Sequence, residues 1–270
     1  MIDFDHKSLY NICCEVRKKM LTERRQQLIA DYVNEHGICR VAELCNLTST
    51  SESTVRRDLS EMEEQGLLKR VHGGARSVKT SFSQDVSQHI RFNLNREEKI
   101  QIAEQAVKHV HQGDYVYLDA GTTVYETVPF LKKIPDLHVV TNGLDTALAC
   151  VNAGLDTCLI GGSIKHQTHA TIGSTALDKV GHLNFNVAFI GANALSKSGQ
   201  LTTPDTEEAA IKRAAIMQSQ NTFALVDHSK FDSVTFAEFA TTDEVTVISR
   251  ILTFEDKQKL PENIQLEEAE

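Results

Sequence analysis

The sequence lacks any run of about 18 apolar residues, so we expect no segment of its 270 residues to cross a membrane. Its first residues include Asp3 and Asp5 and lack the apolar core of a secretory signal, which indicates a cytoplasmic protein. The 6 cysteines include no C-x-x-C pair, the spacing typical of zinc and redox sites. We therefore expect reduced, packed thiols, with no disulfide, no metal and no cofactor.

The chain is acidic overall, which by itself argues against a nucleic-acid partner, but its charge is unevenly distributed. The formal net charge is −9. Residues 17–79 hold 12 Lys+Arg against 9 Asp+Glu, a net of +3, whereas the remainder holds 16 against 28, a net of −12. A basic N-terminal part on an acidic body is the asymmetry expected where only one end of a protein approaches phosphates.

A helix-turn-helix is predicted in the basic part of the chain. The apolar spacing predicts three helices, over residues 22–34, 41–47 and 52–65. Val55, Leu59 and Met62 follow one another at i, i+4 and i+7, so one side of the third helix is expected to be buried. Residues 48–51 are polar and turn the chain before that helix.

The exposed start of the third helix carries the first candidate DNA contacts. The N-terminal part of this helix is the part that enters the major groove, where Arg can pair with guanine and Ser or Thr can reach bases or phosphates. An isolated arginine pair would more simply be a solvated surface with Asp58 as counter-ion. The candidates are Ser51, Ser53, Thr54, Arg56 and Arg57.

The residues after Gly66 favour the DNA-binding alternative. Residues 67–76 are typical of a strand, a glycine turn and a returning strand. A basic hairpin directly after a recognition helix is the wing of a winged helix, which contacts the DNA backbone. The candidate wing contacts are Lys69, Arg70, His72 and Arg76.

Beyond residue 77 the chain predicts a linker and then an α/β domain. Residues 77–95 are polar and lack apolar periodicity. Short apolar runs then alternate with helical stretches, which is typical of a mainly parallel sheet. The predicted strands cover residues 115–118, 138–140, 157–160, 187–190, 223–226 and 245–248. The predicted helices cover residues 96–111, 124–131, 144–153, 174–180 and 207–218.

Glycine and polar residues collect where these strands end, which is where ligands bind in open α/β sheets. Gly121 to Thr123 is the best candidate for cradling a phosphate, and three lysines supply possible charges for it. Each feature alone has a simpler explanation as turn chemistry or helix capping. Five such strand ends in one domain favour a binding site. The candidates are Asp119, Gly121, Thr122, Thr123, Thr141, Asn142, Gly162, Lys165, Asn193, Lys212, Asp227 and Lys230.

The motifs named above resemble the DeoR family of bacterial sugar-catabolism regulators. The similarity rests on residues 20–25, 51–59 and 66–75 in the head, and on residues 118–123, 140–142, 161–162, 202–212 and 227–231 in the body. It implies a sensor domain related in fold to ribose-5-phosphate isomerase that binds phosphosugars, and it adds Asp205 and Glu207 to the candidate effector contacts. The segments 162–168 and 199–205 look most like repressors of fructose operons, whose inducer is fructose 1-phosphate. Ala194 and His228 depart from the usual family pattern.

The sequence therefore predicts a winged helix-turn-helix head over residues 20–76, a linker over 77–95 and a sensor domain over 96–255. Residues 1–19 are expected to be an extension and residues 256–270 a C-terminal tail, of which the acidic residues 262–270 are expected to fray. The predicted function is a homo-oligomeric repressor that binds operator DNA and is relieved by a phosphorylated sugar. The alternative is a sugar-phosphate isomerase with a DNA-binding head, disfavoured because Asn193 stands where a catalytic carboxylate is expected. A purely structural module explains neither the wing nor the loops.

Overall fold

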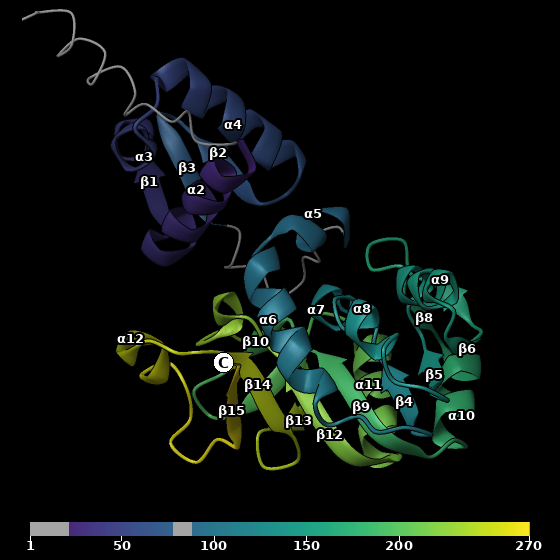
Figure 1. Cartoon of the computed structure of the whole chain (residues 1–270). Coiled ribbons are helices and arrows are strands. Elements are labelled where there is room, and N and C mark those ends of the chain that lie inside the picture. The colour runs from purple at the N-terminus through teal and green to yellow at the C-terminus, as the bar shows by residue number, and fades with distance from the viewer. Residues whose placement is uncertain (1–21, 78–87, 270) are drawn as a thin grey trace, which may run out of the picture. The chain divides into compact units, whose positions relative to one another are not determined.

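A computed structural model of the chain describes residues 22–77 and 88–269 (Figure 1). The chain folds into two compact units that divide between residues 78 and 79. The described part of the first unit is a winged helix. Its elements are α2 (Thr22–His36), β1 (Ile38–Arg40), α3 (Val41–Thr48), α4 (Glu52–Glu64), β2 (Leu68–Val71) and β3 (Gly74–Ser77).

The three strands of the first unit form an antiparallel sheet in the order β1-β3-β2. Strand β1 was not predicted, because three residues are too few to show a sequence period. A Cβ on Gly74 would lie 2.0 Å from the carbonyl oxygen of Cys39, so β3 can approach β1 this closely only with glycine there. The predicted stripe of Val55, Leu59 and Met62 is buried, as expected.

A buried ion pair joins two helices of this unit. Arg25 on α2 donates from Nε and Nη2 to the two carboxylate oxygens of Asp58 on α4, at 2.6 and 2.9 Å. The side chains are 3% and 0% exposed. Asp58 is therefore a structural anchor of the third helix, and it does not serve as the surface counter-ion considered from the sequence.

The second unit is built on a seven-stranded sheet in the order β15-β14-β12-β9-β4-β5-β6. Every neighbouring pair within it runs parallel in the described residues. Its strands are β4 (Tyr115–Leu118), β5 (His138–Thr141), β6 (Asp156–Leu159), β9 (Phe185–Gly191), β12 (Ser219–Leu225), β14 (Thr246–Arg250) and β15 (Leu266–Ala269). Two smaller sheets accompany it, formed by β7 (Ser163–Ile164) with β8 (Thr171–Ile172), and by β10 (Ala194–Leu195), β11 (Gln200–Thr203) and β13 (Ala237–Thr241).

Helices pack on both faces of the large sheet, so it has two apolar cores. Val116 and Leu118 of β4 belong to the core that also contains residues of α6 to α9, whereas Tyr117 belongs to the core beneath α10 and α11. The alternation along β4 is the strand period of two. The helices are α5 (Gln88–Asn93), α6 (Arg96–Val107), α7 (Thr122–Tyr125), α8 (Val128–Leu131), α9 (Leu144–Ala153), α10 (Ser174–Gly181), α11 (Thr206–Met217), the 3₁₀ turn η1 (His228–Lys230) and α12 (Phe254–Lys257).

The predicted fold class, a winged helix-turn-helix head before a mainly parallel α/β domain, is confirmed. Three details of the sequence prediction are corrected. The helix expected over 124–131 is two short helices, because Pro129 stands in the first turn of α8 and cannot continue α7. The segment 77–95 contains α5, so its described end is part of the second unit.

The third correction concerns the C-terminal residues. The acidic segment expected to fray contains β15, which pairs in parallel with β14 at the edge of the sheet. Its carboxylates have partners. Glu267 accepts hydrogen bonds from Gln105 and lies 2.8 Å from His109 Nε2, and Glu268 accepts from the backbone of Leu252 at 2.8 Å. A charge run that the sequence presents as solvated is thus fixed by tertiary contacts. The predicted extension, residues 1–19, lies outside the described residues.

Candidate functional site

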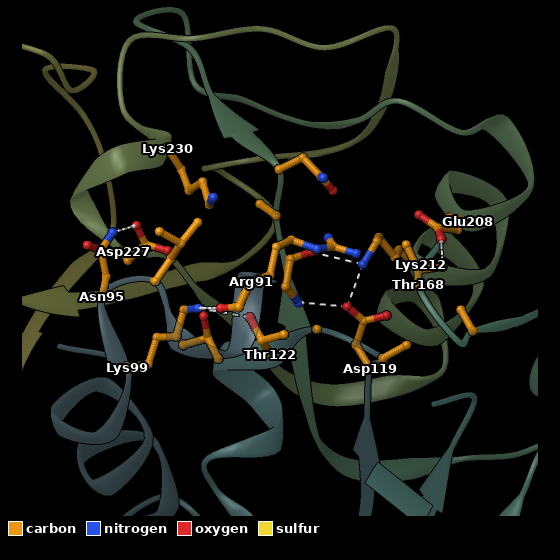
Figure 2. Close-up of a pocket in the computed structure, with 18 of the residues that line it drawn as sticks. Arg91, Asn95, Lys99, Asp119, Thr122, Thr168, Glu208, Lys212, Asp227 and Lys230 are labelled. Atoms are coloured by element: carbon orange, nitrogen blue, oxygen red, sulfur yellow. Dashed lines mark hydrogen bonds and ion pairs between the residues drawn. The ribbon is translucent and has the colours of Figure 1, made fainter. Parts of the chain in front are cut away.

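A polar pocket lies at the carboxyl ends of the central strands β4, β9 and β12 of the second unit (Figure 2). Residues of α5, α6 and α11 complete it. Nine predicted effector contacts line it, namely Asp119, Gly121, Thr122, Thr123, Asn142, Asn193, Lys212, Asp227 and Lys230. The parallel sheet brings these loops together because the carboxyl ends of its strands share one edge.

One side of the pocket is rich in cations. The Lys99 ammonium donates to the Thr122 hydroxyl at 3.0 Å and to the backbone carbonyl of Arg91. Burial, together with the charges of Lys230 and Arg91, lowers the pKa of Lys99 to about 8. Cations crowded in this way favour an anion, because a negative charge would relieve their mutual repulsion.

Asp227 balances part of this charge. Its Oδ1 accepts hydrogen bonds from Asn95 at 2.9 Å, from the Ser229 backbone at 3.1 Å and from the Ser229 hydroxyl at 2.5 Å. Burial alone would raise its pKa, but the nearby Lys230 and Lys99 charges and these hydrogen bonds hold the pKa of Asp227 well below its ordinary value. Asp227 therefore stays ionised and fixes η1, the turn that carries Lys230.

The opposite side of the pocket combines carboxylates with amides and hydroxyls. Lys212 pairs with Asp119, and the two are 8% and 2% exposed. Asp119 also accepts from the backbone N–H of Gly191 at 2.9 Å. Glu208 accepts from Thr168 at 2.5 Å, and Asn142 accepts from the buried Tyr117 hydroxyl. Such a mixture of donors and acceptors suits the hydroxyl groups of a sugar.

The five remaining candidates lie outside the pocket lining. Thr141 is fully buried and its hydroxyl accepts from the Gly143 backbone at 3.0 Å, which shapes the turn after β5. Lys165 pairs with Asp205 and Glu208 at 3.2 and 3.4 Å. Asp205 caps α11, and Glu207 is exposed on its first turn. Gly162 has a φ of 153° at a close approach to Ile172.

Sequence reasoning missed several lining residues, including Arg91, Asn95, Lys99, Thr168 and Glu208. Lys99 had a usable signal. Lys99 precedes Ile102 by three residues and Ala103 by four, so it lies on the buried face of α6. A charged side chain on a buried helix face indicates a functional site. Arg91 and Asn95 had none, because they fall in a segment without apolar periodicity.

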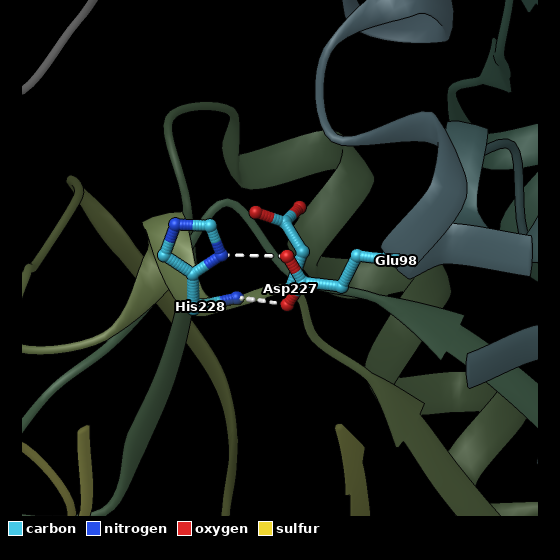
Figure 3. A group of neighbouring side chains, drawn as sticks. All are labelled: Glu98, Asp227 and His228. Atoms are coloured by element: carbon cyan, nitrogen blue, oxygen red, sulfur yellow. Dashed lines mark hydrogen bonds and ion pairs between the residues drawn. The ribbon is translucent and has the colours of Figure 1, made fainter. Parts of the chain in front are cut away.

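Beside the pocket, Glu98, Asp227 and His228 form an acidic group (Figure 3). Glu98 accepts from the His228 backbone at 2.8 Å and faces its Nδ1 at 2.6 Å, and this contact raises the pKa of His228. Arg250 lies 3.5 Å from Glu98. The surrounding cations already balance these carboxylates, so the geometry is that of a support for η1 rather than of a metal site.

The candidate DNA contacts lie on the outer surface of the first unit. Ser51 caps α4, accepting from the Thr54 backbone at 3.4 Å. Arg56 and Arg57 are 50% and 69% exposed, and each lies near a glutamate of the same helix. Ser53 is exposed and Thr54 is half-buried. Within the described residues of the first unit, the start of α4 is therefore accessible to the major groove of DNA.

The wing is the hairpin of β2 and β3. Lys69 is paired directly with Arg76 across the strands, and both side chains are exposed, as is His72 at the turn. Two like charges opposite each other are unfavourable in isolation. Arg70 differs, because its guanidinium donates to the Ser60 hydroxyl at 2.7 Å and its backbone N–H to Glu63 at 2.8 Å. Arg70 therefore joins the wing to the recognition helix.

Both units match known family models. Residues 25–81 match the DeoR-like helix-turn-helix domain, and residues 94–250 match the DeoR C terminal sensor domain. The chain belongs to the DeoR family. It is a DNA-binding transcriptional regulator with a C-terminal sensor domain. Within the described residues, every helix is too short or too polar to span a membrane.

Several curated relatives cover nearly all of this DeoR-family chain. It is 40% identical to the "Uncharacterized HTH-type transcriptional regulator FruR" of Bacillus subtilis, over 89% of this chain and 96% of that protein. It is 32% identical to the lactose phosphotransferase system repressor of Staphylococcus aureus N315, over 89% and 96%. Among solved structures, ribose 5-phosphate isomerase from Plasmodium falciparum is 17% identical over 49% of this chain and 51% of that one, with a TM-score of 0.37. That distant likeness concerns the fold alone.

The two departures from the usual DeoR pattern lie outside the pocket lining. Ala194 is 1% exposed on β10. His228 lies behind the pocket against Glu98, at the start of the turn that ends in Lys230. His228 is therefore part of the turn that carries Lys230, and it does not itself line the pocket.

Proposed function

We propose that this DeoR-family regulator represses a sugar-utilisation operon, and that a phosphorylated sugar in the pocket relieves the repression. The observation that carries the proposal is the polarity of the pocket. Cations gather around Thr122 on one side, and carboxylates, amides and hydroxyls line the other. A molecule that is a dianion at one end and a polyol at the other has this same polarity.

In the proposed complex, the phosphate lies beside Lys99, Lys230 and Thr122, and the sugar hydroxyls face Asp119, Asn142 and Glu208. The 40% identity to a protein named FruR supports a fructose operon as the target, and fructose 1-phosphate is the effector that we propose for it. The similarity to a lactose phosphotransferase system repressor supports a phosphorylated sugar of the same general class.

A thermal-shift screen tests this function. Fructose 1-phosphate should raise the melting temperature of the second unit through mass action, whereas free fructose at the same concentration should not. At a concentration 100 times the dissociation constant, the expected stabilisation is about 2.7 kcal/mol. If another sugar phosphate stabilised the protein instead, the regulated operon would belong to the metabolism of that sugar. If no sugar phosphate raised the melting temperature, the sensor function would be contradicted.

Effector affinity is expected to fall as the pH rises through the pKa of Lys99. That pKa is lowered to about 8, so Lys99 is mainly charged at pH 7 and mainly neutral at pH 9. A phosphate binds the charged form, so binding takes up a proton above pH 8, and affinity should fall about tenfold between pH 7 and pH 9. Calorimetric titration of fructose 1-phosphate measures this slope.

Lys99→Arg is the matched control for the pH profile, because a guanidinium stays charged throughout this range. The variant should bind with an affinity nearly independent of pH between 7 and 9. A wild-type profile that is equally flat would contradict a role for Lys99 at the phosphate.

Operator binding is proposed for the start of α4 and the wing, with paired heads of a homo-oligomer reading paired half-sites. Arg57→Ala removes an exposed charge from α4 and should weaken operator binding by about tenfold or more, as for a lost base or phosphate contact. Fluorescence anisotropy with labelled duplex measures it. Arg213→Ala, which removes a charge from the second unit, should leave operator affinity unchanged, and effector affinity should survive both changes.

The isomerase alternative is tested at the same pocket. Asn193 lines it, and an amide cannot abstract a proton from a sugar carbon. We therefore propose that the pocket binds without turnover. Detectable isomerisation of pentose or hexose phosphates by purified protein would revive the enzyme hypothesis.

A further inference from the structure

Helix α5 is the first described element of the second unit, and it forms part of the pocket wall. Arg91 on α5 and Leu94 and Asn95 after it line the pocket. Residues 78–87 connect α5 to β3, the last strand of the DNA-binding unit. The pocket wall and the connection to the DNA-binding unit are therefore neighbouring parts of one short stretch of chain.

Polar contacts to the pocket loops hold α5 in place. The Gln88 side chain, 3% exposed, donates to the carbonyl of Ala120 at 3.1 Å and to Asp145 at 3.4 Å. Its backbone N–H donates to the carbonyl of Gln167 at 2.9 Å. The Phe92 ring packs edge-on against Tyr125 at 4.7 Å. These contacts join α5 to the loop after β4, to the segment between β7 and β8, and to α7.

Two features couple α5 to an anion in the pocket. First, Lys99 donates both to the Arg91 carbonyl and to Thr122, so the ammonium beside the proposed phosphate also holds α5. Second, Arg91 extends into the pocket between Lys99 and Lys212 (Figure 2). Its Nη2 donates to Gln88 at 3.3 Å, while its Nε is buried and has no hydrogen-bond partner among the described residues.

A buried guanidinium donor without an acceptor favours a ligand that provides one. Phosphate oxygens accept from Arg in a two-pronged geometry that a neutral sugar cannot match. A phosphate held by Arg91 and Lys99 would act on the side chain and on the carbonyl of the same residue, which links α5 physically to an anion in the pocket.

We propose that Arg91 is an effector-binding residue for the phosphate, and that α5 is the element through which the occupied pocket changes operator affinity. The inference rests on the proposed function and adds the element that couples effector binding to operator binding. Gln88 then acts as a positioning residue, since it anchors α5 without lining the pocket.

The test measures the coupling factor, the ratio of operator affinities without and with saturating fructose 1-phosphate, using full-length protein and a duplex that the protein selects from random DNA. The wild type should show a factor of about 5 or more. Arg91→Gln should weaken fructose 1-phosphate binding about tenfold or more and leave effector-free operator affinity unchanged. Gln88→Ala should bind the effector within about threefold of wild type, yet lower the coupling factor toward 1.

Phe92→Ala removes another anchor of α5, so its effector affinity and coupling factor should match those of Gln88→Ala. Agreement between the two variants shows that the result does not come from a folding defect in one of them. Wild-type coupling in both anchor variants, or wild-type effector affinity in Arg91→Gln, would overturn the inference alone. A wild-type protein that binds no sugar phosphate would overturn the proposed function with it.

Discussion

Asp58→Ala is expected to unfold the DNA-binding unit or bring it close to unfolding. The change removes the carboxylate that accepts two hydrogen bonds from Arg25, and a guanidinium that is 3% exposed then loses the Asp58 charge that faces it. Breaking a buried pair from one side costs about 3–5 kcal/mol. That is comparable with the whole stability of many small domains, about 5–15 kcal/mol. Operator binding should therefore be lost while effector binding persists in the second unit.

Urea unfolding followed by circular dichroism measures the effect, with Glu52→Ala as the matched control. Glu52 is a carboxylate on the same helix, paired with Arg56, but it is 63% exposed. An exposed pair contributes about 0–1 kcal/mol, so the control should be nearly neutral. Replacing both partners of the buried pair by apolar residues, as in Arg25→Met with Asp58→Leu, should recover much of the loss. An Asp58→Ala protein as stable as the Glu52 control would show that the pair does not support the fold.

Gly121→Asp should abolish effector binding, with a loss of about 100-fold or more. The new carboxylate would lie at the entrance to Thr122 and Thr123, where the phosphate is proposed to bind, and like charges there repel. It would also approach Asp119, whose Oδ2 is 3.5 Å from the position of a Cβ on residue 121. This would disturb the pair of Asp119 with Lys212. Calorimetric titration with fructose 1-phosphate measures the loss.

Gly121→Ala separates charge from bulk. The added Cβ would meet Gly191 at 3.4 Å and Asp119 at 3.5 Å, which are ordinary contacts, and the backbone of Gly121 is extended, with a φ of −70°. The alanine variant should therefore keep effector affinity within about threefold, since a fitted methyl group adds little strain. If alanine abolished binding as completely as aspartate, close backbone approach and not charge would govern the site. Operator binding without effector should survive both substitutions.

Much of the fold could be predicted because it is encoded locally. Helix α9 begins and ends at the predicted residues, and β4 does so as well, because each has a clear apolar period between glycine or polar ends. The stripe on α4 and the cap at Ser51 define the recognition helix for the same reason. Strands β1, β7 and β10 were missed, since segments of two or three residues show no period.

The candidate site was predictable where residues follow strands of the parallel sheet. Asp119, Asn142, Asn193 and Asp227 all follow predicted strands, and the common direction of those strands brings them to one pocket. Lys165 was predicted to supply a charge for the phosphate, but a local motif does not say which way a side chain turns. Lys165 turns to Asp205 and Glu208 instead.

The sequence by itself determined the class of each unit, the recognition helix and the set of strand ends, because periodicity, caps and turn residues act over a few neighbouring positions. Only the tertiary structure decided which charges are buried and which residues meet. It buried Asp58 against Arg25, turned the acidic C-terminal residues into β15, and brought Arg91 and Lys99 into the pocket. Each of these outcomes depends on partners far away in the chain, and the free energy of burying a charge is set by those partners and not by its sequence neighbours.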